Sequence, residues 1–276
     1  LEQIAASAVT NENAYGAVVQ IVLPGEWTWT YATGDADDYP LLKATPLMKF
    51  RVASITKNFL TTALLMEVQK GKLGLDDLLS KHLRPTMIDS IPNGETVKIR
   101  HILQHTSGIK DYLNENPAFA SKWISDLYYN MSPEELLGVI DTMKPNWAPG
   151  TSYSYSNSNF FIAALLLEQI SGQPYRQYIK QHIVDKLNLT NTYIPAADDT
   201  GIEGDHMRNL VRNGGRAVDY TRMSPSALFG AGDLISNTAD LNTYFQALHR
   251  GDLIADTLVA AILNNSVLMA PNGMRY

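Results

Sequence analysis

The stretch Phe50-Arg51-Val52-Ala53-Ser54-Ile55-Thr56-Lys57 precedes a mostly apolar run that ends near Gly71. Apolar residues recur in this run at roughly helical spacing, and the glycine is a stop signal. The pattern therefore predicts a helix that begins at or just after Ser54. Lys57 lies three residues further on, and residues three apart share one face of a helix, so the lysine amine can reach the serine hydroxyl.

This serine and lysine form a candidate catalytic pair. A hydroxyl is a poor nucleophile until a neighbouring base takes its proton, and a helix start offers unpaired backbone N–H groups that favour developing negative charge. A Ser-x-x-Lys match is nevertheless expected roughly once by chance in a chain of this length. A second match, Ser107-Gly108-Ile109-Lys110, has no apolar helix behind it and is predicted to be a loop. The pair therefore needs support from the rest of the chain.

Composition and charge limit the classes of protein to which the chain can belong. Its 276 residues are 45% hydrophobic and 18% charged, which is typical of a folded protein with one large domain or two intertwined lobes. The net charge of −6 argues against general nucleic-acid binding. No apolar run approaches the roughly 20 residues of a membrane span. The absence of cysteine excludes disulfides and thiolate metal sites.

The N-terminal part of the chain predicts a short surface helix followed by a hairpin. Residues 1–13 suit the helix. Residues 17–23 form a nearly continuous apolar, β-branched run that is typical of a strand covered on both faces. A Pro-Gly turn at 24–25 separates it from residues 27–31, which alternate as a second strand. Because Leu1 is not an initiator methionine, we expect an upstream segment such as a signal peptide to have been removed.

Further helices are expected from apolar periodicity and from start and stop signals. One lies in residues 97–108, where the helix ends in a loop, and the others cover residues 133–143, 160–170, 174–187, 237 or 238–249, and 256–263. The clearest start is Ser132-Pro133-Glu134-Glu135, which has the form of a capping box. Residues 196–229 show little periodicity and are predicted to be a long loop, which in a compact domain is usually functional or mobile.

Two histidines in the stretch 97–108 have the spacing of metal ligands. His101 and His105 are spaced i, i+4, as zinc ligands on a helix can be. The metalloprotease pattern requires glutamate after the first histidine, where this chain has Ile102. No third ligand is evident, so a metal hydrolase is the less favoured alternative, and it predicts that a chelator would inhibit.

Tyr155 and Asn157 are the second pair of candidate site residues. They lie on a short polar stretch between a Pro-Gly turn at 149–150 and the apolar helix expected from Phe160. Rigid elements on both sides hold such a stretch in place. A phenol near the serine could pass a proton to a leaving group, and an asparagine could hold the lysine amine and a substrate amide. The alternative is purely structural, with a packed tyrosine and an asparagine cap for the helix.

Six short pieces of the chain, in order between residues 50 and 241, resemble the serine penicillin-recognising enzymes. They are Phe-Arg-Val-Ala-Ser-Ile-Thr-Lys at 50–57, Gly-Lys-Leu-Gly-Leu-Asp-Asp at 71–77, His-Thr-Ser-Gly-Ile at 105–109, Pro-Gly-Thr-Ser-Tyr-Ser-Tyr-Ser-Asn-Ser-Asn-Phe at 149–160, Leu-Asn-Leu-Thr-Asn-Thr at 187–192 and Ala-Gly-Asp-Leu-Ile-Ser-Asn-Thr-Ala-Asp-Leu at 231–241. This family includes D-alanyl-D-alanine carboxypeptidases, class C-type β-lactamases, and related esterases and D-aminopeptidases.

The resemblance implies an α+β fold of the β-lactamase/DD-peptidase type, with an antiparallel sheet flanked by helices and a mainly helical lobe. Residues 1–58 would form the N-terminal part of the sheet lobe, residues 59–230 the helical lobe, and residues 231–276 the return to the sheet lobe.

The resemblance also assigns roles to four residues and requires no cofactor or metal. Ser54 would be the acylated nucleophile, Lys57 would help to take its proton, Tyr155 would relay protons, and Asn157 would orient Lys57 and the substrate. The general base stays open. Either burial lowers the lysine pKa towards 7, or a charged lysine lowers the tyrosine pKa.

The function implied is that of a periplasmic or secreted serine hydrolase working through an acyl-enzyme. A D-alanyl-D-alanine carboxypeptidase that also binds β-lactams is the leading interpretation, with a small molecule or peptide as substrate. The alternatives are a non-catalytic or weakly active penicillin-binding relative, or an esterase, β-lactamase or D-aminopeptidase of the same fold. The identities of Ser54, Lys57, Tyr155 and Asn157 do not determine whether a peptide, a β-lactam or an ester is the preferred substrate.

One expected part of the family pattern is not found. These enzymes carry a Lys/His-x-Gly motif on a late strand, whereas His249-Arg250-Gly251 lies at a predicted helix end and Lys72-Leu73-Gly74 comes too early. No strand-forming segment follows about residue 266, and a hairpin alone leaves an open edge. We therefore expect a truncated or cleaved chain, with the missing C-terminal strands in further residues or in a second polypeptide. A naturally short relative is the alternative.

Overall fold

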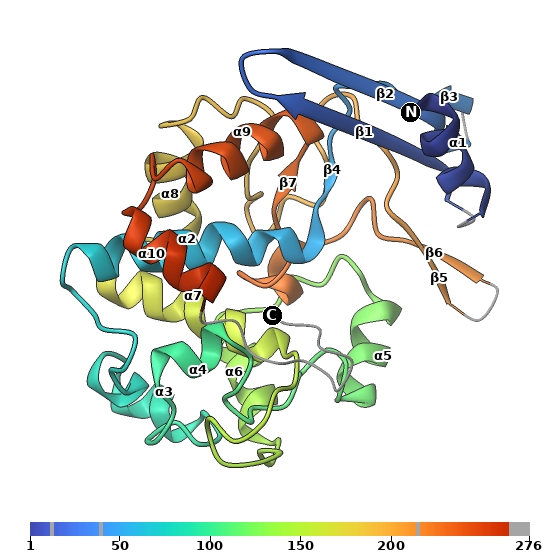
Figure 1. Cartoon of the computed structure of the whole chain (residues 1–276). Coiled ribbons are helices and arrows are strands. Elements are labelled where there is room, and N and C mark those ends of the chain that lie inside the picture. The colour runs from blue at the N-terminus through green and yellow to red at the C-terminus, as the bar shows by residue number, and fades with distance from the viewer. Residues whose placement is uncertain (12–13, 39–40, 214–215, 265–276) are drawn as a thin grey trace.

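The computed structural model describes residues 1–11, 14–38, 41–213 and 216–264 (Figure 1). Its α+β fold confirms the predicted class. The helices are α1 (Glu2–Asn11), α2 (Thr56–Gln69), α3 (Pro85–Asp89), α4 (Ile99–Leu103), α5 (Pro117–Ser125), α6 (Pro133–Asp141), α7 (Asn157–Ser171), α8 (Tyr175–Ile179), α9 (Thr238–His249) and α10 (Asp256–Asn264). Shorter turns are η1 (Ala53–Ile55), η2 (Leu79–Lys81), the π-helical η3 (Lys180–Val184) and η4 (Pro225–Leu228). The strands are β1 (Gly16–Leu23), β2 (Trp27–Asp38), β3 (Leu41–Lys43), β4 (Phe50–Arg51), β5 (Leu210–Asn213), β6 (Arg216–Asp219) and β7 (Ile235–Ser236).

The predicted N-terminal hairpin is confirmed as β1 and β2. The two strands pair antiparallel from Gly16 opposite Gly34 to Leu23 opposite Trp27, and β3 adds to the far side of β2. The prediction that both faces of this first strand are covered was wrong, because every residue from Gly16 to Val22 is only half-buried. Within the described ranges β1 pairs with β2 alone, so its other edge is open.

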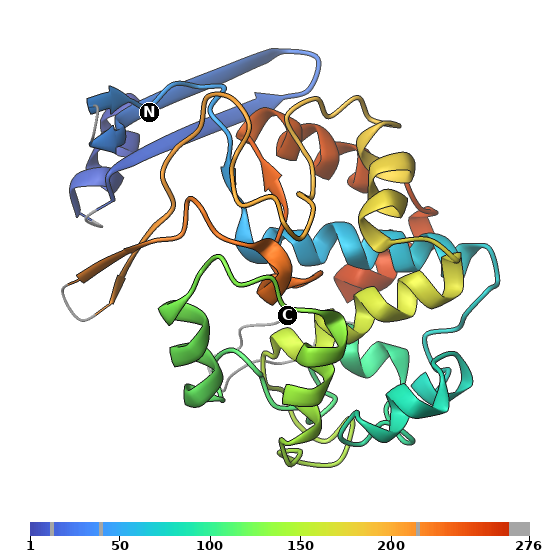
Figure 2. The same cartoon turned by 180° about the vertical axis from the view of Figure 1, so that it is seen from behind.

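Helix α2 forms the centre of the fold. Figures 1 and 2 show it crossing the middle of the molecule between α7 and α9. Phe59, Leu60 and Leu64 on α2 are completely buried. The Phe59 ring stacks on Tyr244 of α9 at 3.8 Å between centroids. Each Å² of apolar surface buried on folding contributes roughly 25 cal/mol of stability. The buried side chains of α2 therefore hold the helix firmly in the core, and with it the residues at its N-terminus.

Strands β4 and β7 connect this helix to the later part of the chain. Phe50 pairs with Ser236, and Arg51 pairs with Ile235. The buried guanidinium of Arg51 donates to the backbone carbonyls of Thr221 and Met223, both at 3.2 Å. Residues before Ser54 are therefore fixed by contacts with residues about 170 positions further along the chain.

The predicted helices are present, with shifted boundaries. Helix α7 begins at Asn157, three residues earlier than expected, and ends before Gly172, which has a φ of +72°. The region 174–187 divides into α8 and η3. The long-loop prediction for 196–229 was wrong in part, because it contains the β5–β6 hairpin. That hairpin includes polar and charged positions such as Arg212, so it lacks the alternating apolar pattern on which strand prediction depends.

Two expectations concern the chain as a whole. The prediction that no strand follows residue 266 lies outside the described residues. Among the residues that the structure describes, none of the helices combines the length and the hydropathy needed to cross a bilayer.

Candidate active site

A strained turn presents Ser54 at the start of α2. Ala53 adopts a φ of +46°, a left-handed conformation that costs a non-glycine residue about 1–3 kcal/mol. The Val52 N–H donates to the Leu234 carbonyl at 3.0 Å, and Thr56 Oγ1 donates to the Ala53 carbonyl at 2.7 Å. These bonds hold the turn so that Ser54 is exposed while Lys57, one turn later, is buried.

The four residues singled out by sequence share one hydrogen-bond cluster. Ser54 Oγ lies 2.6 Å from Tyr155 Oη and 3.1 Å from Lys57 Nζ. Lys57 Nζ also donates to Asn157 Oδ1 at 2.9 Å and to the backbone carbonyl of Ala231 at 2.5 Å. Three acceptors therefore surround the lysine nitrogen. One of them, the Ala231 carbonyl, could not have been found from the sequence, because every residue has such a group.

Burial changes the protonation of Lys57. The side chain is only 2% exposed, and burial lowers its pKa to about 7, against the opposing charges of Asp111 and Asp233. About half of the molecules would thus carry a neutral amine at neutral pH. Of the two alternatives left open for the general base, this electrostatic environment favours the neutral lysine.

Tyr155 packs against a neutral histidine. The His105 ring lies 4.4 Å from the Tyr155 ring, centroid to centroid, and His105 Nδ1 accepts a hydrogen bond from the Ser156 N–H at 3.1 Å. Burial lowers the pKa of His105 to about 3, whereas burial raises the pKa of Tyr155. The phenol therefore keeps its proton at neutral pH and is suited to donate it.

The two histidines at i, i+4 spacing, for which a metal site was the disfavoured alternative, do not face a common site. His105 lies beyond the end of α4 and faces Tyr155, whereas His101 Nδ1 accepts from the Lys98 N–H at 3.2 Å. Throughout the described ranges, no group of three His, Cys, Asp or Glu residues could hold a metal ion. The second Ser-x-x-Lys match is a loop, as predicted, and Ser107 Oγ donates to Asn159 Oδ1 at 2.6 Å.

Asn157 is the first residue of α7 rather than a loop residue. Its Nδ2 donates to both carboxylate oxygens of Asp111, at 3.0 and 3.2 Å. Sequence reasoning missed Asp111, which is 1% exposed. A signal was available, because Asp111 follows the His-Thr-Ser-Gly-Ile piece by two residues.

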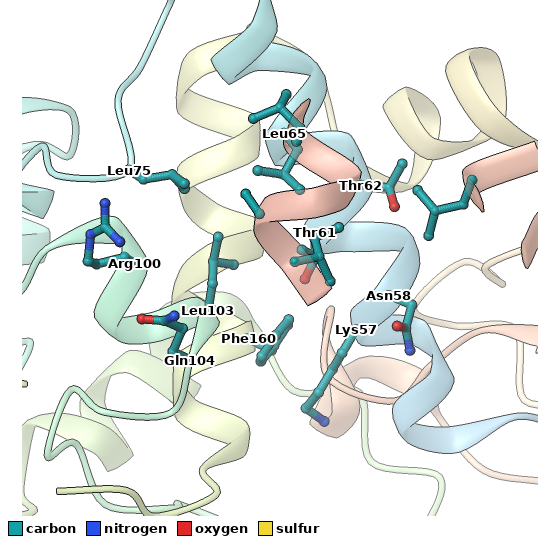
Figure 3. A pocket seen from close by; sticks show the side chains of 14 residues that line it. Lys57, Asn58, Thr61, Thr62, Leu65, Leu75, Arg100, Leu103, Gln104 and Phe160 are labelled. Carbon is teal, nitrogen blue, oxygen red and sulfur yellow. The ribbon is translucent and has the colours of Figure 1, made fainter. Parts of the chain in front are cut away.

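A cavity of about 330 Å³ lies beside the lysine (Figure 3). Lys57, Asn58 and Thr61 of α2 form one wall, and Phe160 of α7 lies close to the lysine stem. Ser54 is not among the lining residues. The cavity therefore borders the stem of Lys57 rather than the position where an acyl group on Ser54 would lie.

Comparison with known proteins gives consistent results. The family model described as Beta-lactamase matches residues 1–270. PbpX of Bacillus subtilis, named as a penicillin-binding protein, is 29% identical over 242 residues, which are 88% of this chain and 57% of that protein. The chain thus spans little more than half the length of this relative.

Two solved structures illustrate the likeness in fold. A D-stereospecific amidohydrolase from Streptomyces sp. superposes with a TM-score of 0.87 at 29% identity, covering 98% of this chain and 78% of that chain. The D-amino acid amidase from Ochrobactrum anthropi superposes with a TM-score of 0.83 at 21% identity, covering 98% and 75%. At that identity the second comparison supports the fold alone.

Proposed function

The chain belongs to the Beta-lactamase family, and on this premise we propose that it is a serine hydrolase that forms an acyl-enzyme on Ser54. The proposed substrate is a peptide that ends in D-alanyl-D-alanine, and β-lactams would acylate the same serine. The observation that carries the proposal is the position of Ser54 Oγ, within hydrogen-bond distance of both Lys57 Nζ and Tyr155 Oη.

The acceptors around Lys57 support a role as general base. A neutral amine has two N–H groups and one lone pair. The amide oxygens of Asn157 and Ala231 can only accept, so they take the two N–H groups and leave the lone pair directed at Ser54 Oγ. Ser54 would then give its proton to Lys57 as Oγ bonds to the substrate carbonyl carbon.

Tyr155 would complete the acylation step. As the C–N bond of the substrate breaks, the phenol donates its proton to the leaving nitrogen, and the ammonium of Lys57 restores the phenol. In deacylation, water takes the place of the leaving amine and gives a proton to the Tyr155–Lys57 pair as its oxygen bonds to the ester carbon. The ester C–O bond then breaks and Lys57 returns a proton to Ser54 Oγ, which leaves all three residues in their starting states. General acid–base catalysis of this kind contributes about 10²–10⁴-fold.

A second candidate is D-stereospecific hydrolysis of amides, favoured by the 29% identity and 0.87 TM-score with the Streptomyces D-stereospecific amidohydrolase. The test measures free D-alanine released from a peptide ending in D-alanyl-D-alanine, and ammonia released from D-phenylalanine amide. We expect faster D-alanine release, lost in Ser54→Ala and retained in Ser121→Ala, a control at an exposed serine. Faster ammonia release would favour the second candidate, and no turnover of either compound would favour a non-catalytic penicillin-binding relative.

The sheet and the location of the protein are part of the same proposal. The open edge of β1 is consistent with strands outside the described residues, in further residues of the chain or in a second polypeptide, that complete the sheet. A natural protein that ends at Tyr276 and is stable and active alone would refute this part. We propose a periplasmic or secreted location, which fractionation of the source cells would test.

A further inference from the structure

Asp111 holds the side chain of Asn157 from behind. Its carboxylate accepts two contacts from Asn157 Nδ2, one from the Leu113 N–H at 2.9 Å and one from Asn114 Nδ2 at 2.6 Å. All of these donors are amide N–H groups, so each of these hydrogen bonds requires the carboxylate to accept. The side chain is almost completely buried, which removes water as a competing partner.

This contact decides which end of the Asn157 amide faces the lysine. With Nδ2 directed at Asp111, Oδ1 faces Lys57 Nζ at 2.9 Å. A flipped amide would place Oδ1 against the carboxylate, where two acceptors meet without a proton, and would turn Nδ2 towards the lysine. A neutral lysine would then direct its lone pair at Nδ2 instead of at Ser54.

We propose that Asp111 is a positioning residue, which fixes the amide of Asn157 and thereby directs the lone pair of Lys57 at Ser54 Oγ. This inference rests on the acyl-enzyme function proposed above. It adds to that function a residue that does not touch the substrate.

The charge of Asp111 gives the proposal a second readout. Four titratable groups lie near the lysine amine. Asp111 and His105 follow α4, Tyr155 precedes α7, and Asp233 precedes β7. The negative charges of Asp111 and Asp233 raise the pKa of Lys57 against the larger effect of burial. Removal of the Asp111 charge therefore lowers the pKa of Lys57, so the neutral amine persists to lower pH.

The test compares the rate of acylation by benzylpenicillin in wild type and Asp111→Asn as a function of pH. We expect a rate on the order of 10- to 100-fold lower at pH 8, as for loss of a hydrogen bond to a charged group. The acid limb of the profile should also move to lower pH. Glu115→Gln is the matched control, because its carboxylate accepts from the Asp111 backbone N–H without contacting Asn157. We expect its rate and acid limb to equal those of wild type.

A double-mutant cycle tests whether Asp111 acts through Asn157. In an Asn157→Ala background, Asp111→Asn should slow acylation less than about twofold further, because the amide it positions is absent. If Asp111→Asn does not fold, Asn114→Ala at an exposed position removes one donor to the carboxylate and should slow acylation about two- to fivefold.

Three results would overturn the inference while leaving the proposed function in place. They are an unchanged rate and acid limb in Asp111→Asn, an equal loss in both backgrounds of the cycle, and an unchanged rate in Asn114→Ala where that variant must be used. A wild-type protein that is not acylated at all would instead refute the proposed function.

Discussion

Lowering the pH from 9 to 5 should slow acylation of Ser54 about 100-fold. Lys57 is 2% exposed, and burial lowers its pKa from 10.5 to about 7. This shift corresponds to about 5 kcal/mol against the charged form. Only about 1% of the lysine is neutral at pH 5, and nearly all of it is neutral at pH 9. Because acylation needs the neutral amine, the rate should rise about tenfold between pH 5 and 6, rise less steeply through pH 7, and reach a plateau above pH 8.

The assay is rapid-quench mass spectrometry of the benzylpenicillin adduct between pH 5 and 10, with Ser54→Ala as the baseline. A rate that does not change between pH 5 and 8 would contradict the reasoning. So would a rate that still climbs tenfold for each pH unit between pH 8 and 10. In that second case Lys57 would keep an ordinary pKa near 10.5, and burial would not have prepared it as a base.

Three other predictions concern Tyr155, His105 and Gly230. Tyr155→Phe should slow acylation about 10²–10⁴-fold through loss of the proton donor, and a mass assay that shows no slowing would exclude the tyrosine as general acid. His105 has a folded pKa of about 3, below its unfolded value, so its stabilising contribution is complete above pH 6.5 and is lost as the pH falls. Between pH 6.5 and 4, wild type should therefore lose about 3 kcal/mol more of its free energy of unfolding than His105→Gln does, as measured by urea titration. An equal loss in the two proteins would contradict this. Gly230→Ala should reduce stability by about 1–3 kcal/mol, because φ is +67° and the new Cβ would meet Ala164 Cβ at 2.6 Å; an unchanged Tm would show that the turn can relax.

The sequence predicted the elements whose signals are local. Ser132 caps α6 by a complete capping box, and Asn237 caps α9 by accepting from the Asp240 N–H. Both caps act within one helical turn, so residue identity alone predicts them. The β5–β6 hairpin and the β4–β7 pair were missed, because each depends on pairing that its few residues do not encode.

The candidate site was predicted only as far as side-chain identity allows. Ser54 lies in η1 directly before α2, and Lys57 lies in the first turn of α2, so their close spacing in the sequence predicts their contact. Asn157 comes from 100 residues away, and the resemblance rather than the spacing linked it to Lys57. The contacts of the Ala231 carbonyl and the Asp111 carboxylate were not predicted, because both depend on tertiary packing.

The most direct test of the acyl-enzyme is the intact mass of the protein before and after incubation with benzylpenicillin, followed by peptide mapping. We expect one adduct per chain, located on Ser54 and absent from Ser54→Ala. An adduct on another residue, or no adduct under conditions in which the protein is folded, would contradict the proposal that Ser54 is the nucleophile.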